Sequence, residues 1–447
     1  MPTKAYFNML LVYVQKITPR NRYVFKTIFK SYLSVDYTLT SDIEKFKEWD
    51  RPKFSYLSRP IGDEFNFTSA GLLEQVGIAE QSLPSKLYLN TPTIFPVRSD
   101  TLPFDVFAAT FYMLSRYEEY LPHMRDQYDR FMAKDSLAAK EGFLQVAVVD
   151  RWMILLKGVL QKQFSELKFP ERKYDYIPTL DIDNAYAFKH KGLLRTIGSL
   201  GKTLLTFDFS KLGSQCQVLF GVKKDPFDTY DYQLALQRKF NYKAIYFILI
   251  GDYGLNDKNL SFENRYFKSL IKSISDYAYL GIHPSFGSNK QLSKLQVEIN
   301  RLKDIIKTDV KRSRQHFLKL SLPETYRNLL EADIEEDYTM GFASELGFRA
   351  GTCTPYPFYD LDGEVECKLT VFPFHVMEAT LKYYLNLSPE QAISQSKQII
   401  DEVKAVEGTF ISLWHNESLS NEGEWMGWRT VYEKVVEYAI SMKDGRP

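Results

Sequence analysis

Two aspartates that could hold a metal ion and accept a proton lie at the end of a short predicted strand. The stretch 177–183 is entered through Pro178 and carries Asp181 and Asp183 at its end. Because a strand alternates its side chains between two faces, both carboxylates leave on the same side, roughly 7 Å apart. Two such carboxylates repel each other unless a cation or a shared proton relieves the repulsion. The pair is therefore a candidate site for a metal and a base, and the alternative is that both aspartates cap the following turn.

The elements that would position these carboxylates recur after Tyr174, where predicted strands alternate with predicted helices. Strands are predicted at 177–181, 244–250, 279–283, 314–318, 347–350, 370–374 and 409–414, and helices at 230–240, 262–277, 291–306, 323–331, 389–406 and 425–441. Such alternation favours parallel pairing, and about seven units predict a distorted (β/α)7–8 barrel rather than an open sheet.

Side chains that could do chemistry fall at the carboxyl ends of several of these strands. His283 ends the third strand and His316 lies within the fourth. Arg349 lies in the next, and His375 and His415 end the last two. Barrel enzymes build their active sites at this face, because the strands fix the geometry there while the loops vary. We therefore expect at least three of these strand-end residues to share one site.

The order and placement of these motifs resemble those of the polysaccharide deacetylase superfamily, the NodB-homology domain. The resemblance implies Asp181 as general base, with Asp183 and His283 as metal ligands. Where the family has a second histidine, four residues after the first, this chain has Gly287, which leaves the metal one ligand short. His316 is the nearest replacement, and the residues alone leave open whether it binds the metal or the substrate.

The family's last two motifs have looser counterparts. Arg349 lies in a segment similar to the family's arginine motif, which implies that it holds the carboxylate of Asp181; pairing with a structural acid such as Glu345 is the alternative. Leu413-Trp414-His415 is similar to the final motif, which implies His415 as the general acid.

Four further side chains are candidates for contacts with the substrate near the mouth of the predicted barrel: Trp414, Asn416, Asp337 and Trp425. The rings of Trp414 and Trp425 could stack on a sugar; for Trp425, three residues before Trp428 on a predicted helix, packing in the core is the alternative.

Composition narrows the classes of protein. The 57 basic and 56 acidic residues nearly cancel, so no global field predicts nucleic acid or an anionic membrane as a partner. The three cysteines are widely spaced and predict neither a disulfide framework nor a cysteine-based zinc site. No stretch approaches about 18 consecutive apolar residues, the length that suggests a membrane span. The apolar run 9–14 is too short for a signal-peptide core, so we expect a cytoplasmic protein.

At 447 residues the chain is long enough for two domains. We expect a smaller mixed α/β domain of unknown role at 1–168 and the barrel at 174–443, separated by a charged linker that contains Pro170. The resemblance to the deacetylase superfamily covers about 174–441, and it is closer to a branch in which that domain follows an N-terminal α/β region.

These observations predict a metal-dependent hydrolase that removes an N-acetyl or other acyl group from a saccharide, acting on a carbon–nitrogen bond other than a peptide bond. One divalent ion, zinc by preference or else cobalt, nickel or manganese, would be held by Asp183, His283 and His316. In the expected compartment, a small, nucleotide-linked or lipid-linked saccharide fits better than a wall polymer.

Two alternatives use the same residues. The first is a non-catalytic saccharide-binding relative whose metal site has decayed, which Gly287 suggests. The second is a glycosyltransferase in which Asp181 and Asp183 hold a metal-bound nucleotide sugar. That enzyme would need a Rossmann-like sheet, and the sequence shows no glycine-rich phosphate loop.

Overall fold

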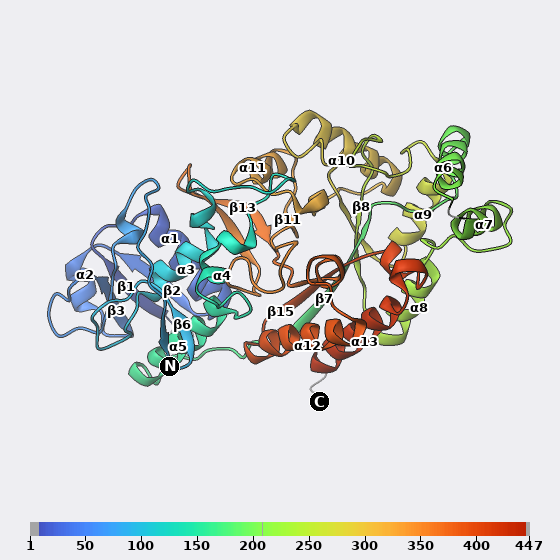
Figure 1. Ribbon diagram of the computed structural model, residues 1–447. Helices are drawn as coiled ribbons and strands as arrows, with labels where there is room; N and C mark the ends of the chain where they lie inside the picture. The colour runs from blue at the N-terminus through green and yellow to red at the C-terminus, as the bar shows by residue number, and fades with distance from the viewer. Residues whose placement is uncertain (1–8, 208, 444–447) are drawn as a thin grey trace, which may run out of the picture.

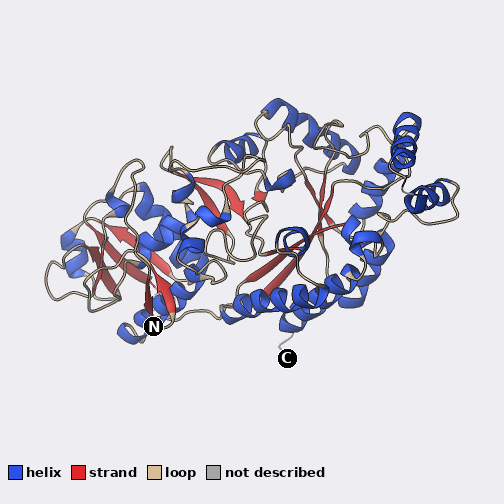
Figure 2. Cartoon of the chain, in the orientation of Figure 1, coloured by secondary structure: helices blue, strands red, loops and turns tan. Residues whose placement is uncertain are grey.

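The computed structural model describes residues 9–207 and 209–443, which form two α/β parts with separate sheets (Figures 1 and 2). The first sheet has the strand order β2-β1-β3-β4 with every pair parallel. Its strands are β1 (Met9–Val14), β2 (Asp36–Thr40), β3 (Lys53–Leu57) and β4 (Asn66–Thr68), and a separate ribbon pairs β5 (Lys86–Tyr88) with β6 (Thr91–Thr93). The helices of this part are α1 (Pro19–Lys26), α2 (Ile43–Glu48), α3 (Val106–Leu114), α4 (Leu137–Lys140) and α5 (Val148–Gln163).

The second sheet has nine strands in the order β12-β13-β11-β10-β9-β8-β7-β15-β14. Every pair is parallel except the antiparallel pair of β12 and β13. The strands are β7 (Asp175–Ile182), β8 (Ile245–Ile248), β9 (Tyr279–Ile282), β10 (Arg312–Ser313), β11 (Glu336–Asp337), β12 (Tyr356–Asp360), β13 (Val365–Val371), β14 (Val376–Met377) and β15 (Thr409–His415). The predicted alternating α/β arrangement is confirmed, but the hydrogen-bonded ladder of the described residues ends at β12 and β14 and does not close into a barrel.

The helices that connect these strands agree well with the predicted ones. They are α8 (Tyr230–Phe240), α9 (Arg265–Ser275), α10 (Leu292–Ile306), α11 (Glu324–Glu331), α12 (Pro389–Ala405) and α13 (Trp428–Lys443). Two further helices, α6 (Leu193–Leu205) and α7 (Phe209–Leu219), occupy a stretch for which the sequence analysis predicted no element.

Two predicted strands are wrong. Strand β10 ends at Ser313, and residues 316–318 form a short helical turn in which Phe317 and Leu318 have φ values of 59° and 55°. The segment 347–350 is a loop, because the Phe348 amide donates to the Leu144 carbonyl at 2.9 Å instead of joining the sheet. Both departures occur where the second part of the chain meets residues of the first.

The second sheet is strongly curved, and Arg314 marks the curvature. Arg314 follows β10, yet its Nη1 donates to Asp181 on β7 at 2.9 Å. In a flat sheet these two strands would be about 14 Å apart, because β9 and β8 lie between them at about 4.8 Å per strand. The guanidinium carbon lies 4.5 Å from the ring centre of Phe247 and 5.7 Å from that of Phe374. Arg314 therefore fills the concave side of the sheet.

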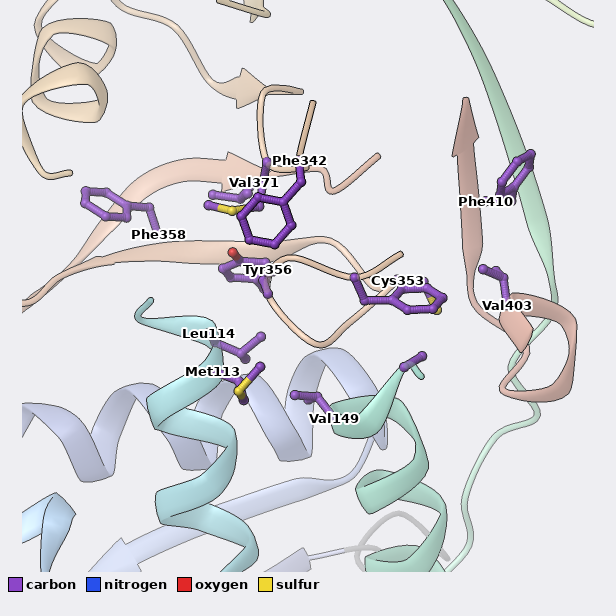
Figure 3. Close-up of a cluster of buried hydrophobic side chains, with 14 of the residues drawn as sticks. Met113, Leu114, Val149, Phe342, Cys353, Tyr356, Phe358, Val371, Val403 and Phe410 are labelled. Carbon is purple, nitrogen blue, oxygen red and sulfur yellow. The ribbon is translucent and has the colours of Figure 1, made fainter. Parts of the chain in front are cut away.

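The two parts of the chain share one continuous hydrophobic core. Figure 3 shows Met113 of α3 and Val149 of α5 packed below Tyr356 and Cys353 of the second part. The contact is close enough that a Cβ atom added to Gly351 would lie 2.8 Å from the Met113 Cε. The predicted domain boundary between 168 and 174 remains a prediction.

A buried cluster of charges also crosses this junction. The Glu119 carboxylate accepts from Arg349 Nε and Nη2 at 2.9 and 2.7 Å and from Arg116 Nε at 2.8 Å. Burial disfavours the charged carboxylate, but the two arginines outweigh this effect and lower the pKa of Glu119 to about 2. Glu119 thus stays ionised and joins the first part of the chain to the loop that carries Arg349.

We predict that Glu119→Gln destabilises the protein by about 3–5 kcal/mol, because it leaves two buried guanidinium groups without their shared carboxylate. The free energy of unfolding in urea measures the effect. Glu44→Gln is the matched control, since Glu44 pairs with Lys47 on the exposed surface and such pairs contribute little. Equal stability of both variants would show that the Glu119 cluster does not hold the junction together.

Candidate active site

A pocket of about 280 Å³ opens beside the carboxyl ends of β7, β9 and β15. It contains five of the residues predicted from the sequence: Asp181, Asp183, His283, His316 and His415. The remaining wall is mostly apolar or aromatic and includes Phe317, Leu318, Ala343, Met377, Ala379, Tyr383, Tyr384 and Leu413. The structure therefore brings the predicted strand-end residues together, with the exceptions of Arg349 and His375.

Asp183, His283 and His316 form a compact group of metal-binding side chains. Their ligand atoms all lie within 4.8 Å of one another. His283 Nε2 is 3.1 Å from Asp183 Oδ1, and His316 Nε2 is 3.3 Å from Asp183 Oδ2. Gly287, at the position of the family's second histidine, does not line this pocket. The three residues come from segments that follow β7, β9 and β10, so the curvature of the sheet is what brings them together.

In His283 and His316, the hydrogen bond made by Nδ1 determines whether Nε2, which faces Asp183, carries a proton or a lone pair. His283 Nδ1 lies 2.6 Å from the Arg314 carbonyl, which can only accept, so Nδ1 carries a proton and Nε2 presents a lone pair. His316 Nδ1 is 2.8 Å from Asp257 Oδ1, which assigns the same tautomer. When both imidazoles are neutral, two nitrogen lone pairs face the carboxylate of Asp183, and this arrangement is repulsive unless a cation lies between them. This donor set fits a divalent metal ion with nitrogen and oxygen ligands.

The pKa shifts of Asp183 and His316 also favour a bound cation. Burial favours the protonated form of Asp183, but His316 and His283 outweigh it and hold the pKa of this carboxyl well below its usual range. Burial lowers the pKa of His316, but Asp183 and Asp257 outweigh it and raise the pKa to about 9. The centre therefore attracts positive charge, whether a proton or a metal ion supplies it.

Asp181 is held by an arginine, but not by the predicted one. Its Oδ1 accepts from Arg314, while its Oδ2 is 3.7 Å from His283 Nε2. The prediction that Arg349 holds Asp181 is wrong, because the loop of Arg349 faces the first part of the chain and its guanidinium binds Glu119. Strand alternation offered a signal for Arg314, since it would place this residue on the same face as His316.

His415 is held in place by a carboxylate that the sequence analysis missed. Its Nδ1 is 2.6 Å from Glu378 Oε1, and its Nε2 is 3.7 Å from Asp183 Oδ2. Burial lowers the pKa of His415, but Glu378, then Asp183 and Asp181, outweigh burial and raise the pKa well above its usual value. These carboxylates therefore favour the positively charged form of His415, which lines the pocket. No sequence motif marks Glu378, which follows β14 directly.

Two candidates for substrate contacts around β15 are structural. Trp414 is fully buried and packs on Tyr432, because strand alternation turns it away from the pocket when His415 faces it. The Asn416 amide nitrogen donates to the carbonyls of Asn184 and Phe227 at 3.1 and 3.0 Å and so joins two loops. Both predictions of substrate contact are wrong in this structure.

The other two candidates also lie outside the pocket lining. Asp337 is fully buried on β11 and accepts from the amide and hydroxyl of Thr339. Trp425 lies one layer behind the wall, with its ring 5.4 Å from that of Tyr383, which does line the pocket. His375, which the sequence also placed at a strand end, is packed between Phe348 and Phe410.

The first part of the chain contributes Arg130 to the pocket wall. Its Nη1 donates to the Phe317 carbonyl at 3.0 Å and its Nη2 to the Tyr384 hydroxyl at 3.2 Å, while Asp126 pairs with the guanidinium. The ring of Tyr128 lies 4.9 Å from that of Phe317. The loop around Arg130 therefore supports the turn that begins at His316.

Comparisons with known proteins find likenesses for both parts of the chain. Residues 10–165 match a family of unknown function (DUF7033). No curated protein matches the sequence. The structure resembles that of a candidate polysaccharide deacetylase from Mycobacterium smegmatis, with 13% identity, a TM-score of 0.40, and coverage of 62% of this chain and 88% of that one.

Two further solved structures are similar at lower scores. A polysaccharide deacetylase from Bacillus cereus is 12% identical, with a TM-score of 0.29 and coverage of 60% of this chain and 88% of that one. A CE4 family pseudoenzyme from Bacillus anthracis is 11% identical, with a TM-score of 0.29 and coverage of 59% and 61%.

We predict that His316→Ala and His283→Ala each weaken the binding of Zn²⁺ or Co²⁺ by more than about 100-fold, and that Asp257→Asn weakens it by about 10–100-fold by releasing the His316 ring. Isothermal titration calorimetry of the chelator-treated protein measures the affinities. His123→Ala, which removes a histidine outside the pocket, is the control. Unchanged affinity in His316→Ala would show that His316 is not a ligand.

Proposed function

We propose that the protein is a divalent-metal-dependent hydrolase that removes an N-acetyl or other acyl group from a saccharide or a saccharide precursor. The observation that supports this function is the meeting, in one pocket, of a three-residue metal centre, an arginine-held carboxylate and a carboxylate-held imidazolium. Each of these groups suits one part of amide hydrolysis.

Asp183, His283 and His316 would hold the metal ion, zinc by preference or cobalt, nickel or manganese. When bound, such an ion polarises a carbonyl group and lowers the pKa of a water molecule. The Asp183 carboxylate contacts both His283 and His316, so it would orient the two imidazole rings and add a negative charge to the metal site.

Asp181 is the general base of this proposal. Arg314 occupies its Oδ1, which fixes the plane of the carboxylate, so Oδ2 remains to accept the proton of the attacking water. Both residues are buried, and the position of Oδ2 is therefore set by the sheet rather than by a mobile loop.

His415 is the general acid. The carboxylate of Glu378 binds Nδ1–H, which directs the second proton, on Nε2, toward the pocket. A leaving amine that receives this proton departs as a neutral group. The apolar side chains of Leu413 and Met377 lie beside this histidine and offer a surface for the acyl group.

The two alternative functions explain less of the site. A saccharide-binding protein needs neither the Arg314–Asp181 pair nor the Glu378–His415 pair. A glycosyltransferase that binds metal through Asp181 and Asp183 gives no role to the Glu378–His415 pair. The hydrolase uses all of these contacts.

We predict that Asp181→Asn and His415→Gln each lower the rate of acyl release by about 10²–10⁴-fold while metal affinity stays close to that of the parent, because neither residue is a proposed ligand. Proton NMR of released acetate measures the rate, with N-acetylglucosamine oligomers and UDP-N-acetylglucosamine as the first substrates. A metal-loaded protein that binds these saccharides but releases no acetate would favour the saccharide-binding alternative.

The contacts of Arg130 assign a supporting role to the first part of the chain. Arg130→Ala removes the donor to the Phe317 carbonyl, next to His316, where the backbone holds two consecutive residues at positive φ. We predict that metal affinity falls by about 3–10-fold, a smaller effect than that of a direct partner of a ligand. Arg130→Lys should recover part of the loss, and Arg22→Ala on the exposed surface should have no effect. Calorimetry measures all three, and parental affinity in Arg130→Ala would contradict this role.

A further inference from the structure

Helices α6 and α7 form a hairpin that projects from the body of the molecule (Figure 1). The hairpin lies in the segment that connects β7 to α8, and this segment begins at Asp183. Asn416, the residue after His415, donates to the carbonyls of Asn184 and Phe227 and so holds both ends of the insertion together. The insertion therefore begins and ends near the carboxyl ends of β7 and β15, which carry residues of the candidate active site.

The apolar face of the amphipathic helix α6 is exposed to solvent. Leu193, Leu194, Ile197, Leu204 and Leu205 lie on one face at helical spacing, and all five are exposed. Leu194 and Leu205 keep 87% and 79% of their surface exposed. An amphipathic helix of a globular protein normally turns this face to the core.

The polar face of α6 is the one that contacts protein. Thr203 is buried, and Gln215 of α7 donates to the Ser199 hydroxyl at 2.7 Å. Arg195 donates to the Asn259 carbonyl and lies 4.1 Å from the ring centre of Tyr253 on the body. Because these contacts fix the orientation of the helix, the leucine face cannot turn inward without breaking them.

The exposed apolar surface continues beyond α6. Ten of the 25 large apolar side chains that are exposed among the described residues lie within 193–222. Besides the five on α6 they are Phe207, Phe209, Leu219, Phe220 and Val222. Apolar side chains gathered in one segment in this way mark an interaction surface rather than ordinary surface composition.

The stretch 189–222, which contains this segment and the four residues before it, is basic. It has five lysines and arginines against one acid, Asp208, a net charge of +4 in a chain whose total is +1, and 193–222 alone has a net charge of +2. Leucine and phenylalanine side chains combined with clustered lysines are the composition of helices that lie in the headgroup region of anionic bilayers. The hairpin does not span a bilayer: α6 has 13 residues and α7 has 11, and no helix in 9–207 or 209–443 is long and apolar enough to cross one.

We propose that the α6–α7 hairpin docks on the surface of a bilayer that contains anionic lipids, with the leucine face of α6 among the acyl chains. Docking would hold the candidate active site near the membrane surface, which suits a lipid-linked saccharide. That consequence rests on the proposed function, whereas docking itself does not.

Flotation of the full-length protein with lipid vesicles tests the proposal without any assay of activity or metal. We expect the protein to float with vesicles of phosphatidylcholine and phosphatidylglycerol, and to bind pure phosphatidylcholine vesicles less. In the double variant L194E/L205E, partitioning should fall by at least about tenfold, because two leucine side chains no longer enter the bilayer. The matched control is V76E/L87E, which changes two side chains that are 88% and 75% exposed outside the hairpin and should bind like the parent.

Three outcomes would overturn the proposal. The first is the absence of binding to either kind of vesicle. The second is equal loss of binding in L194E/L205E and V76E/L87E, which would show that the hairpin has no special role. The third is a dimer in light scattering that L194E/L205E dissociates while vesicles do not bind, which would make the leucine face an interface between two copies of the chain.

Discussion

The contact between Arg314 and Asp181 is the constraint on which the candidate site depends. It joins Asp181 on β7 to the residue that follows β10, and β8 and β9 lie between these two strands, so the contact exists only because the sheet is curved. The guanidinium lies among aromatic rings on the concave side, where an unpaired charge would be costly. The Arg314 carbonyl also accepts a hydrogen bond from His283 Nδ1. One residue thus places both the candidate base and a candidate metal ligand.

The three histidines of the pocket follow one design. In each, Nδ1 contacts an oxygen atom, from the Arg314 carbonyl for His283, Asp257 for His316 and Glu378 for His415. Such partners fix the ring and leave Nε2 to act in the pocket. Two of these partners, Asp257 and Glu378, are carboxylates, and the third is a neutral carbonyl. The histidines differ instead in their distance from Asp183: Nε2 of His283 and His316 lies 3.1 and 3.3 Å from its oxygens, whereas Nε2 of His415 lies 3.7 Å away.

The first part of the chain is more than an attachment to the second. It shares the hydrophobic core with the second part. Its Glu119 forms an ion pair with Arg349, and its Arg130 donates a hydrogen bond to the turn that begins at His316. This turn places Phe317 and Leu318 at positive φ, a conformation that costs energy outside glycine and persists only where surrounding contacts hold it. The contact of Arg130 with the Phe317 carbonyl supports the turn that places the candidate ligand His316 beside Asp183.

The sequence by itself determined the alternating α/β order, most helix boundaries, and the membership of Asp181, Asp183, His283, His316 and His415 in one site, because periodicity and strand-end position are local properties. Only the tertiary structure decided which partners these residues have. Arg314 replaced Arg349 beside Asp181, Glu378 and Asp257 joined the histidines, and Trp414 turned away from the pocket. Those contacts join residues far apart in the chain, and they depend on how sharply the sheet curves and on where the first part packs, which no spacing within the sequence specifies.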